Sequence, residues 1–278
     1  MLPRFLLITL RAFVRLLSAI SPRAAGRFGV WLFCTPRRHR APAWEHRLAA
    51  RGTALRIGPG LAAHAFGSGP AVLLVHGWEG RGTQLGRFVE PLVAAGCRAI
   101  AIDLPAHGGS PGRRTDLIEC TEALRRAVRE AGPIAGVIAH SFGAAVVTLA
   151  LERGMQASAA VLIAAPSSIA NVLGRFAALT GLRGAATRAF QEALEKQAGV
   201  RLRDVEIFER VAALRVPALI VHDSDDREVP FEDAERLAAR WPGATLLATR
   251  GHGHRRILKD ETIVRRAVAF VTPSGAVF

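Results

Sequence analysis

The sequence predicts an α/β fold whose central sheet is mostly parallel and carries helices on both faces. Short runs that are almost wholly apolar recur along the chain, which is typical of strands buried on both sides of a parallel sheet. The runs are Ala71–Val75, Ala99–Ile102, Gly136–Ala139, Ala160–Ala164, Ala218–Val221 and Ala244–Ala248. Helical segments separate them, and this alternation predicts right-handed crossovers in a doubly wound sheet.

Two further strands, Ala54–Ile57 and Leu61–Phe66, are predicted ahead of these runs because Gly58-Pro59-Gly60 is a hairpin turn signal. The expected helices are Gln84–Ala95, Asp116–Ala131, Phe142–Arg153 and Phe231–Trp241. The last of these helices has Glu232 and Asp233 in its first turn, where carboxylates interact favourably with the helix dipole.

The composition is that of a folded protein with a sizeable core. A length of 278 residues fits one large domain or two small ones, and half of the residues are apolar. The three cysteines, Cys34, Cys97 and Cys120, are widely spaced, which argues against a disulfide framework or a zinc cluster. We therefore expect a cytoplasmic protein without a metal or another cofactor.

The formal net charge of +14 is carried almost wholly by arginine. Such basicity favours anionic partners such as membranes or nucleic acids. The arginines are scattered over most of the chain, and no nucleic-acid motif or interleaving of aromatic and basic residues accompanies them. Nucleic acid is therefore not an expected partner.

The chain divides into an arm, residues 1–45, and a domain, residues 46–278. Phe5–Ile20 is mostly apolar, but Arg11 and Arg15 interrupt it. Each arginine costs about 2.5–3.5 kcal/mol at a bilayer centre, and the stretch is shorter than the roughly 20 residues that a spanning helix needs. We predict neither a transmembrane helix nor a signal peptide, since no clear cleavage site follows.

The arm is better explained as a basic amphipathic helix. Arg4, Arg11 and Arg15 share one narrow helical face, because they are spaced by seven and four residues. The remaining positions hold Leu6, Leu7, Leu10, Phe13, Val14 and Leu17. Two interpretations remain. Residues 1–40, which include the basic cluster Arg37-Arg38-His39-Arg40, contact the inner face of the membrane, or the helix packs on its own domain and the cluster is a solvated turn.

Ser141 is the predicted nucleophile. It lies between a strand that ends at Ile138-Ala139 and a helix that opens with Gly143-Ala144-Ala145. A serine on such a tight turn exposes its hydroxyl at the sheet edge, and the turn requires small residues two positions before and after it. Ala139 and Gly143 meet that need, although glycine is usual at the first position. The following helix N-terminus also stabilises developing negative charge.

A serine nucleophile needs a base, and the base needs a carboxylate that orients it. Residues 221–230, Val-His-Asp-Ser-Asp-Asp-Arg-Glu-Val-Pro, follow one strand, and Gly251-His252-Gly253-His254 follows the next. The order serine, aspartate, histidine is the one that this arrangement requires. Both segments begin at the carboxyl ends of strands, where open α/β sheets carry their sites.

Four motifs together resemble the α/β-hydrolase superfamily, in the group of small esterases, monoacylglycerol-lipase-like enzymes and serine aminopeptidases. His76-Gly77-Trp78-Glu79-Gly80 resembles the oxyanion loop of the family. Residues 103–110 resemble its D-x-P-G-H-G-x-S loop, with Ala106 in place of glycine. The D-D-x-x-V-P and G-x-G-H patterns resemble the acid and base loops. The resemblance covers about residues 54–271 and implies the α/β-hydrolase fold.

The resemblance assigns the triad to Ser141, Asp226 and His254. It places the catalytic carboxylate four residues before the proline, at Asp226, with Asp225 as the alternative. His254 fits the base position, and His252 is the second candidate.

The resemblance also assigns the oxyanion hole to the backbone N–H groups of Trp78 and Phe142. Such donors contribute roughly 2.7–4 kcal/mol each in other enzymes. The Trp78 and Phe142 side chains either form pocket walls or pack in the core. His76 and His107 are expected to be structural, and the His140 side chain is expected to point away from the nucleophile.

A lid is expected before the seventh strand. The segment between Ala165 and Ala218 is longer than one crossover requires, and we assign the crossover helix to Asp204–Leu214, with Asp204 as its N-cap. Residues 166–203 then form a small helical lid. Its apolar face comprises Ile169, Leu173, Phe176, Leu179 and Leu182. This face either covers an acyl group or packs against the body.

The expected function is hydrolysis of a carboxylic ester through an acyl-enzyme, with a small apolar acyl compound as substrate. A thioesterase, an aminopeptidase or an acyltransferase would use the same triad. A non-catalytic, membrane-associated binding protein would have a broken triad, whereas all three members are present. The physiological substrate, the substrate-binding residues and the oligomeric state do not follow from the sequence.

Overall fold

The computed structural model of the chain describes residues 4–272, which form two compact units. One unit comprises the residues up to Pro36 together with Ser168–Glu206, and is called here the helical unit. The other comprises Arg37–Ser167 and the residues from Ile207 onward, and is called the sheet unit. The arm predicted for residues 1–45 and the lid predicted for residues 166–203 therefore lie mostly in the same unit.

The sheet unit is built on eight strands, which confirms the predicted fold class. Their order is β1 (Thr53–Ile57), β2 (Leu61–Phe66), β4 (Arg98–Ile102), β3 (Ala71–Val75), β5 (Ile134–His140), β6 (Ala160–Ile163), β7 (Ala218–Asp223) and β8 (Ala244–Thr249). β2 is antiparallel to β1 and β4, and the strands from β4 to β8 are parallel. Every predicted strand is present, with small differences at the ends.

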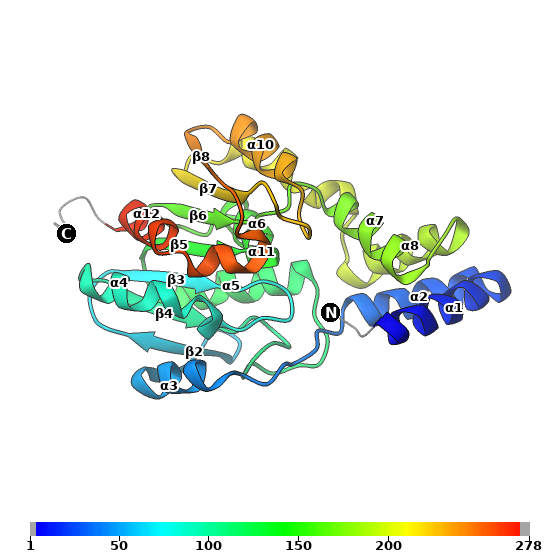
Figure 1. Cartoon of the computed structure of the whole chain (residues 1–278), viewed down its shortest axis with the longest axis horizontal. Helices are drawn as coiled ribbons and strands as arrows, with labels where there is room; N and C mark the ends of the chain where they lie inside the picture. Colours follow the sequence, from blue (N-terminus) through cyan, green and yellow to red (C-terminus); the bar gives the residue numbers. More distant parts are fainter. Residues whose placement is uncertain (1–3, 273–278) are drawn as a thin grey trace. The chain divides into compact units, whose positions relative to one another are not determined.

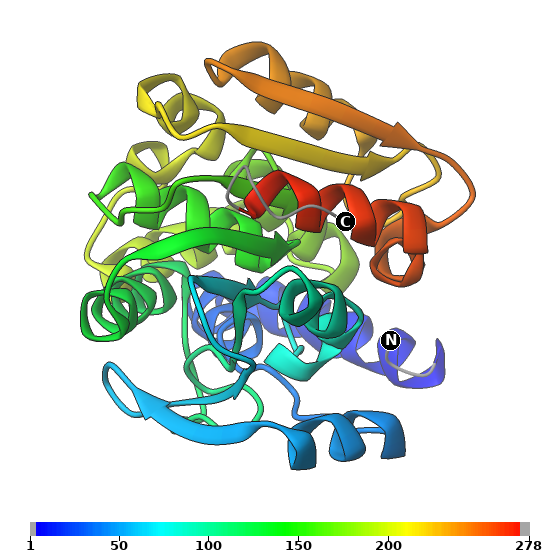
Figure 2. The same ribbon diagram turned by 90° about the vertical axis from the view of Figure 1, so that its left-hand side faces the viewer.

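Helices cover both faces of this sheet. One face carries α4 (Val89–Ala94) and α12 (Glu261–Val271), and in Figure 2 the red α12 lies in front of the strands. The other face carries α5 (Leu117–Ala131), α6 (Phe142–Glu152) and α10 (Phe231–Arg240). Shorter elements complete the unit: α3 (Ala43–Arg51), the 3₁₀ segment Gly82–Phe88, α9 (Ile207–Arg210), the 3₁₀ segment Val211–Ala213, α11 (Gly253–Arg256) and the 3₁₀ segment Ile257–Lys259.

The side chains of the central strands are buried on both faces of the sheet, which makes the sheet a rigid support for a site. Alternate residues of neighbouring strands, such as Val72 and Leu74 on β3 and Val161 and Ile163 on β6, have no exposed area and belong to one apolar cluster with α12. Successive side chains of a strand point to opposite faces, so the residues between them pack on the other helix layer. Full burial of each such side chain contributes about 1.5–3 kcal/mol.

The helical unit consists of α1 (Arg4–Ile20), α2 (Pro22–Phe33), α7 (Ile169–Thr180) and α8 (Ala185–Ala198), followed by the 3₁₀ segment Leu202–Val205. Figure 1 shows the first two helices beside the other two. Close packing of α2 on α8 depends on Gly26, where a Cβ atom would lie 2.6 Å from the Ala189 carbonyl carbon. Val14, Leu173, Leu182 and Phe190 are buried in their shared core.

Most of the apolar face predicted for the lid belongs to this shared core. Leu173 and Leu182 are buried and Phe176 is partly buried against the N-terminal helices, whereas Leu179 is exposed. The face that we considered as a cover for an acyl group or as a contact with the body thus packs largely within the helical unit. No helix in the described part of the chain combines the length and the apolar character that crossing a membrane requires.

The helix predicted over Asp204–Leu214 is wrong. The chain instead forms Leu202–Val205, α9 and Val211–Ala213, with an extended backbone at Glu206 (φ −65°, ψ 116°). The Glu206 carboxylate accepts the N–H groups of Ile169 and Ala170 at 3.2 and 2.7 Å, so it satisfies the open N-terminus of α7. Asp204 lies inside the 3₁₀ segment and is not an N-cap. The bonds from Glu206 to the N-terminus of α7, which no local sequence pattern indicates, therefore outweigh the helix propensity of residues 204–214.

Candidate active site

Ser141 occupies the sharp turn between β5 and α6. Its backbone has φ 52° and ψ −119°, a strained conformation for a residue with a side chain. The turn packs tightly, because a Cβ atom on Gly143 would lie 2.4 Å from the His76 carbonyl oxygen. Ala139, which replaces the usual glycine, is fully buried in β5 without disturbing the turn. The sequence therefore imposes the geometry of an exposed nucleophile elbow.

The structure brings Ser141, His254 and Asp226 together at the carboxyl edge of the sheet. The Nε2 atom of His254 lies 2.9 Å from the Ser141 Oγ atom. Its Nδ1 atom lies 2.7 Å from the Oδ2 atom of Asp226. Both distances are within the range that proton transfer between a nucleophile, a base and an orienting carboxylate requires.

The carboxylate of Asp226 is held ionised within the loop after β7. Its side chain has no exposed area, and burial alone would raise its pKa. Hydrogen bonds from His222, His254 and the Val229 backbone N–H outweigh burial and lower the pKa of Asp226 well below its usual range. The Glu228 N–H also donates to Oδ1 at 2.7 Å. A negative charge is therefore available to stabilise a protonated His254.

The other two aspartates of the loop have different contacts. Asp223 accepts hydrogen bonds from the backbone of Asp225, His252 and Gly253 and from the Thr249 hydroxyl, so it ties the acid loop to the base loop. Burial would raise the pKa of Asp223, but these bonds lower it. The Asp225 carboxylate accepts the backbone N–H of Gly251.

These contacts separate the candidates left open by the sequence. His254 pairs with Asp226, whereas the Asp225 carboxylate accepts the backbone N–H of Gly251 in the base loop. His252, the second candidate base, lies 3.8 Å from the carboxylate of Asp260. Ser141, His254 and Asp226, the residues that the resemblance assigned, are therefore joined by hydrogen bonds from the hydroxyl to the carboxylate.

His140 makes a contact with the base loop that the sequence did not predict. We expected only that its side chain points away from the nucleophile, and its Nε2 atom lies 2.8 Å from the backbone oxygen of His254. The rings of the two histidines are 4.8 Å apart. Burial lowers the pKa of His140 to about 3, so the imidazole is neutral and donates its Nε2 proton to the carbonyl. No local pattern could reveal this bond, because 114 residues separate the partners.

The loop after β3 carries the predicted oxyanion residue Trp78. The Trp78 and Phe142 rings meet edge to face at 5.1 Å, so both side chains line the same place beside Ser141. Phe142 opens α6, and the first N–H groups of a helix have no partner within it. The two predicted oxyanion residues therefore lie side by side, with Phe142 directly after Ser141.

The end of the predicted arm contacts the loop after β3, which the sequence did not predict. Arg37 forms a bidentate ion pair with Glu79, with distances of 2.8 and 2.9 Å, and His39 lies 3.2 Å from the same carboxylate. Burial would raise the pKa of Glu79, but the Arg37 and His39 contacts lower it to about 2. Glu79 has a positive φ of 57°, which this ion pair helps to hold. The basic cluster is thus only partly a solvated turn.

His76 joins the loops after β3 and β4. It donates from Nδ1 to the Gly77 oxygen at 2.7 Å and accepts the Leu104 N–H at Nε2. Burial lowers the pKa of His76 to about 4, so it bonds as a neutral imidazole. In the second loop Ala106 has φ 62°, a conformation that favours the glycine usual at this position of the motif.

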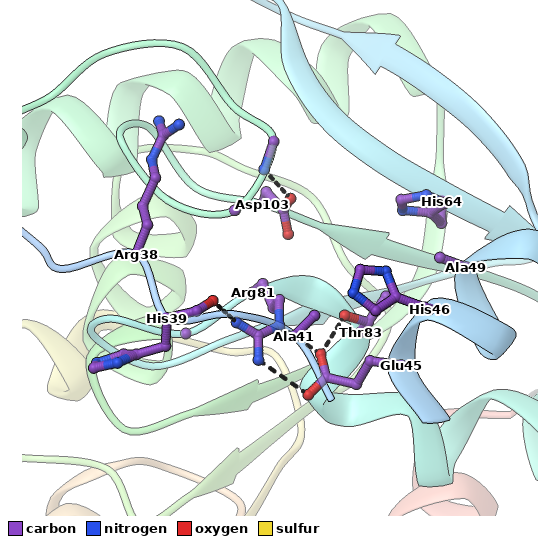
Figure 3. Close-up of a pocket in the computed structure, with 13 residues that line it drawn as sticks. Arg38, His39, Ala41, Glu45, His46, Ala49, His64, Arg81, Thr83 and Asp103 are labelled. Atoms are coloured by element: carbon purple, nitrogen blue, oxygen red, sulfur yellow. Dashed lines mark hydrogen bonds and ion pairs between the residues drawn. The ribbon is translucent and has the colours of Figure 1, made fainter. Parts of the chain in front are cut away.

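A polar cavity of about 250 Å³ lies in the sheet unit away from the triad (Figure 3). It is bordered by α3, His64 and the loops after β3 and β4. Glu45 is buried there in an ion pair with Arg81 at 2.6 Å and accepts the Thr83 hydroxyl at 2.6 Å. These three groups satisfy one another, and no residue of the predicted triad lines the cavity. Within residues 4–272, no cluster of three or more His, Cys, Asp or Glu side chains could hold a metal ion.

The comparisons with known proteins agree with the fold. The model of the alpha/beta hydrolase family matches residues 72–266. A pimeloyl-[acyl-carrier protein] methyl ester esterase of Aromatoleum aromaticum is 28% identical over 231 residues, covering 66% of this chain and 91% of the relative. The corresponding esterase of Xanthomonas campestris is 27% identical over 243 residues, covering 73% of this chain and 95% of the relative.

Solved structures have the same fold. An esterase from Exiguobacterium antarcticum superposes with a TM-score of 0.61 at 17% identity, covering 80% of this chain and 100% of the esterase. A putative lipase from Acinetobacter baumannii superposes with a TM-score of 0.63 at 19% identity, covering 83% and 96%. Because the family model matches well over half of the sequence, this chain belongs to the alpha/beta hydrolase family and is a carboxylesterase-like enzyme.

Proposed function

We propose that the chain hydrolyses a carboxylic ester through an acyl-enzyme formed on Ser141. The observation that supports this most strongly is the unbroken hydrogen-bonded chain from the Ser141 hydroxyl through His254 to Asp226, with distances of 2.9 and 2.7 Å. A buried serine in an ordinary strand-to-helix turn would require neither a bond to a histidine nor a carboxylate behind that histidine.

In the first half-reaction the Ser141 Oγ atom attacks the ester carbonyl carbon and gives its proton to Nε2 of His254. The carbonyl oxygen becomes negatively charged and accepts the N–H groups of Trp78 and Phe142. His254 then returns the proton to the leaving alkoxide, the C–O bond of the ester breaks, and an alcohol departs. Asp226 stabilises the imidazolium in the meantime without taking up the proton.

In the second half-reaction water attacks the acyl-enzyme. His254 takes a proton from the water and later returns it to Ser141, so the carboxylic acid is released and the enzyme is regenerated. We expect a small apolar acyl group. By their names, the two curated relatives act on a methyl ester of a carrier-bound acyl chain, and a methyl ester therefore belongs among the test substrates.

Steady-state kinetics on aryl esters of increasing acyl length test the proposal. Ser141→Ala should lower kcat by about 10⁶-fold, because the nucleophile acts as a unit with its base. The matched control is Ser224→Ala, an exposed serine in the acid loop, which should retain full activity. Equal activity of wild type and Ser141→Ala would exclude the proposed nucleophile.

A second comparison separates the related activities. Thioester, N-terminal amide and ester substrates with the same acyl group are compared through kcat/KM. The proposal predicts the highest value for the ester, with an initial burst of alcohol where breakdown of the acyl-enzyme is slower than its formation. A higher value for the thioester or the amide would replace ester hydrolysis by that reaction while retaining the triad.

A further inference from the structure

The helical unit exposes an unusual concentration of large apolar side chains. Of the eleven exposed large hydrophobic residues in the described chain, seven lie between residues 5 and 31. They are Phe5, Leu6, Ile8, Phe13, Leu16, Ile20 and Trp31. Single exposed apolar residues are normal on a protein surface, but a contiguous group of this kind marks an interaction site.

On α1 these residues form one continuous face. At 3.6 residues per turn, Phe5, Leu16 and Ile20 lie on the same side of the helix, and their exposed fractions are 73%, 62% and 72%. Thr9, in the middle of this side, turns its hydroxyl back to the Leu6 carbonyl oxygen. The opposite side is already occupied, because Val14 is 1% exposed in the core of the unit. The side facing water is therefore apolar, where a surface helix is ordinarily polar.

Positive charge borders this apolar face. Residues 4–36 contain five arginines and no aspartate or glutamate. Arg15 on α1 is exposed, and Arg23 and Arg27 are exposed on α2 in line with Trp31. In the described residues no carboxylate forms an ion pair with any of these three arginines. A complementary partner would thus present both apolar area and negative charge.

We propose that the exposed face of α1, together with Arg23, Arg27 and Trp31 of α2, docks on the surface of a bilayer that contains anionic phospholipid. Apolar side chains on one side, arginines at the border and a tryptophan beside them are the features of a helix that lies in the interface. The arginines supply attraction to the lipid headgroups. A second copy fits less well, because a twofold contact would set the same arginines opposite one another.

Vesicle flotation of the full-length protein tests this docking. One set of vesicles is pure phosphatidylcholine, and the other contains about 30% phosphatidylglycerol as the anionic lipid. We expect flotation with the anionic vesicles only, with weaker binding as salt is raised. Arg23→Gln/Arg27→Gln should lower the partition coefficient by about 30-fold, from roughly 1 kcal/mol per arginine.

Ile8→Glu/Leu16→Glu addresses the apolar face and should lower partitioning by about a thousand-fold, since each side chain loses about 2 kcal/mol of burial. The matched control is Val93→Glu, an exposed apolar helix residue of the sheet unit, which should bind like wild type. Hydrolysis of a soluble aryl ester and the circular dichroism spectrum verify that each variant is folded.

Three outcomes would overturn the proposal. They are no flotation of the wild type, equal binding to neutral and anionic vesicles, or a concentration-dependent dimer that Ile8→Glu/Leu16→Glu dissociates. The last would assign the face to a second copy. None of these outcomes bears on the triad, so the docking and the proposed ester hydrolysis can fail separately.

Discussion

The sheet unit and the helical unit distribute polar and apolar residues in opposite ways. In the sheet unit several buried polar groups lie at the carboxyl edge and bond to one another, and Asp223 joins the acid loop to the base loop in this way. In the helical unit apolar residues fill the core and also occupy the outer face of α1. The hydrogen-bonded edge of the sheet unit is suited to catalysis, which involves a few atoms at fixed positions. The apolar face of α1 is suited to binding over an extended surface.

The two units should therefore respond differently to substitution. A hydrogen-bonded site depends on single donors and acceptors at fixed distances, so one altered atom can abolish its function. An apolar surface or core depends on summed area, so its loss is graded and shared by several residues.

After the loss of the nucleophile itself, the largest effect is expected at Asp226, the acid of the proposed triad. Asp226→Asn keeps the shape but removes the negative charge that orients and stabilises His254, so kcat should fall by about 10⁴-fold. Asp225→Asn is the matched control, because its carboxylate bonds to Gly251 and not to His254, and kcat should change less than about tenfold. Steady-state ester hydrolysis measures both. Equal losses in the two variants would contradict the assignment of the acid.

The next effect concerns the core of the helical unit. Leu173→Ala should destabilise that unit by about 2–5 kcal/mol, because a buried leucine is replaced by a cavity. Leu179→Ala on the same helix is the control and should have little effect, since Leu179 is 53% exposed. Hydrogen exchange should show lost protection in α7 and α8, with β5 and β6 unchanged. Equal loss in the sheet would mean that the two units unfold together.

Acid should destabilise the sheet unit through its buried histidines. The pKa values of His76, His107 and His140 are lowered by burial to about 4, 3 and 3 in the folded chain, below the ordinary value near 6.5. As the pH falls below about 6.5, the unfolded chain takes up protons that the folded chain does not. The stability that neutral histidines contribute is therefore complete above pH 6.5 and is lost toward pH 4.

The three histidines together should lower the free energy of unfolding by about 4 kcal/mol between about pH 7.5 and 5.5. Urea unfolding at the two pH values measures this change, followed by a signal from the sheet unit. His107→Gln should reduce the dependence on pH by about a third. A free energy of unfolding that stays constant over this interval would show that the three residues do not titrate as described.

The smallest effect is expected at His140, whose side chain bonds to the main chain of His254, the proposed base. His140→Ala removes the hydrogen bond to the His254 carbonyl and should lower kcat by about tenfold with little change in KM. His140→Gln retains an N–H donor and should recover part of the loss. If both variants lower stability but leave kcat intact, the contact is structural only.

The sequence was sufficient for the parts that depend on local patterns. The strands are short apolar runs, and Ser141, Asp226 and His254 each follow one of them, so strand order alone brings them to one edge. The resemblance favoured Asp226 over Asp225, and only the structure shows that the Asp226 carboxylate bonds to His254 while that of Asp225 bonds to Gly251.

Contacts between distant segments could not be predicted. Arg37 and Glu79 are 42 residues apart, and the packing of α2 on α8 joins segments separated by most of the chain. The failure at Asp204–Leu214 has the same origin, because Glu206 is extended in order to cap α7. Sequence periodicity identifies the apolar face of a helix but not the element that packs against it. The packing partners of the predicted arm and lid helices therefore became visible only in the structure.

Labelling with a fluorophosphonate probe, followed by digestion and mass spectrometry, would show whether Ser141 is the nucleophile. The probe reacts with a serine only where a base and an oxyanion hole activate the hydroxyl. We expect one covalent adduct, on the peptide that contains Ser141, and none in Ser141→Ala or after unfolding. The absence of an adduct in the folded wild type, or an adduct on another serine, would contradict the proposed catalytic role of Ser141.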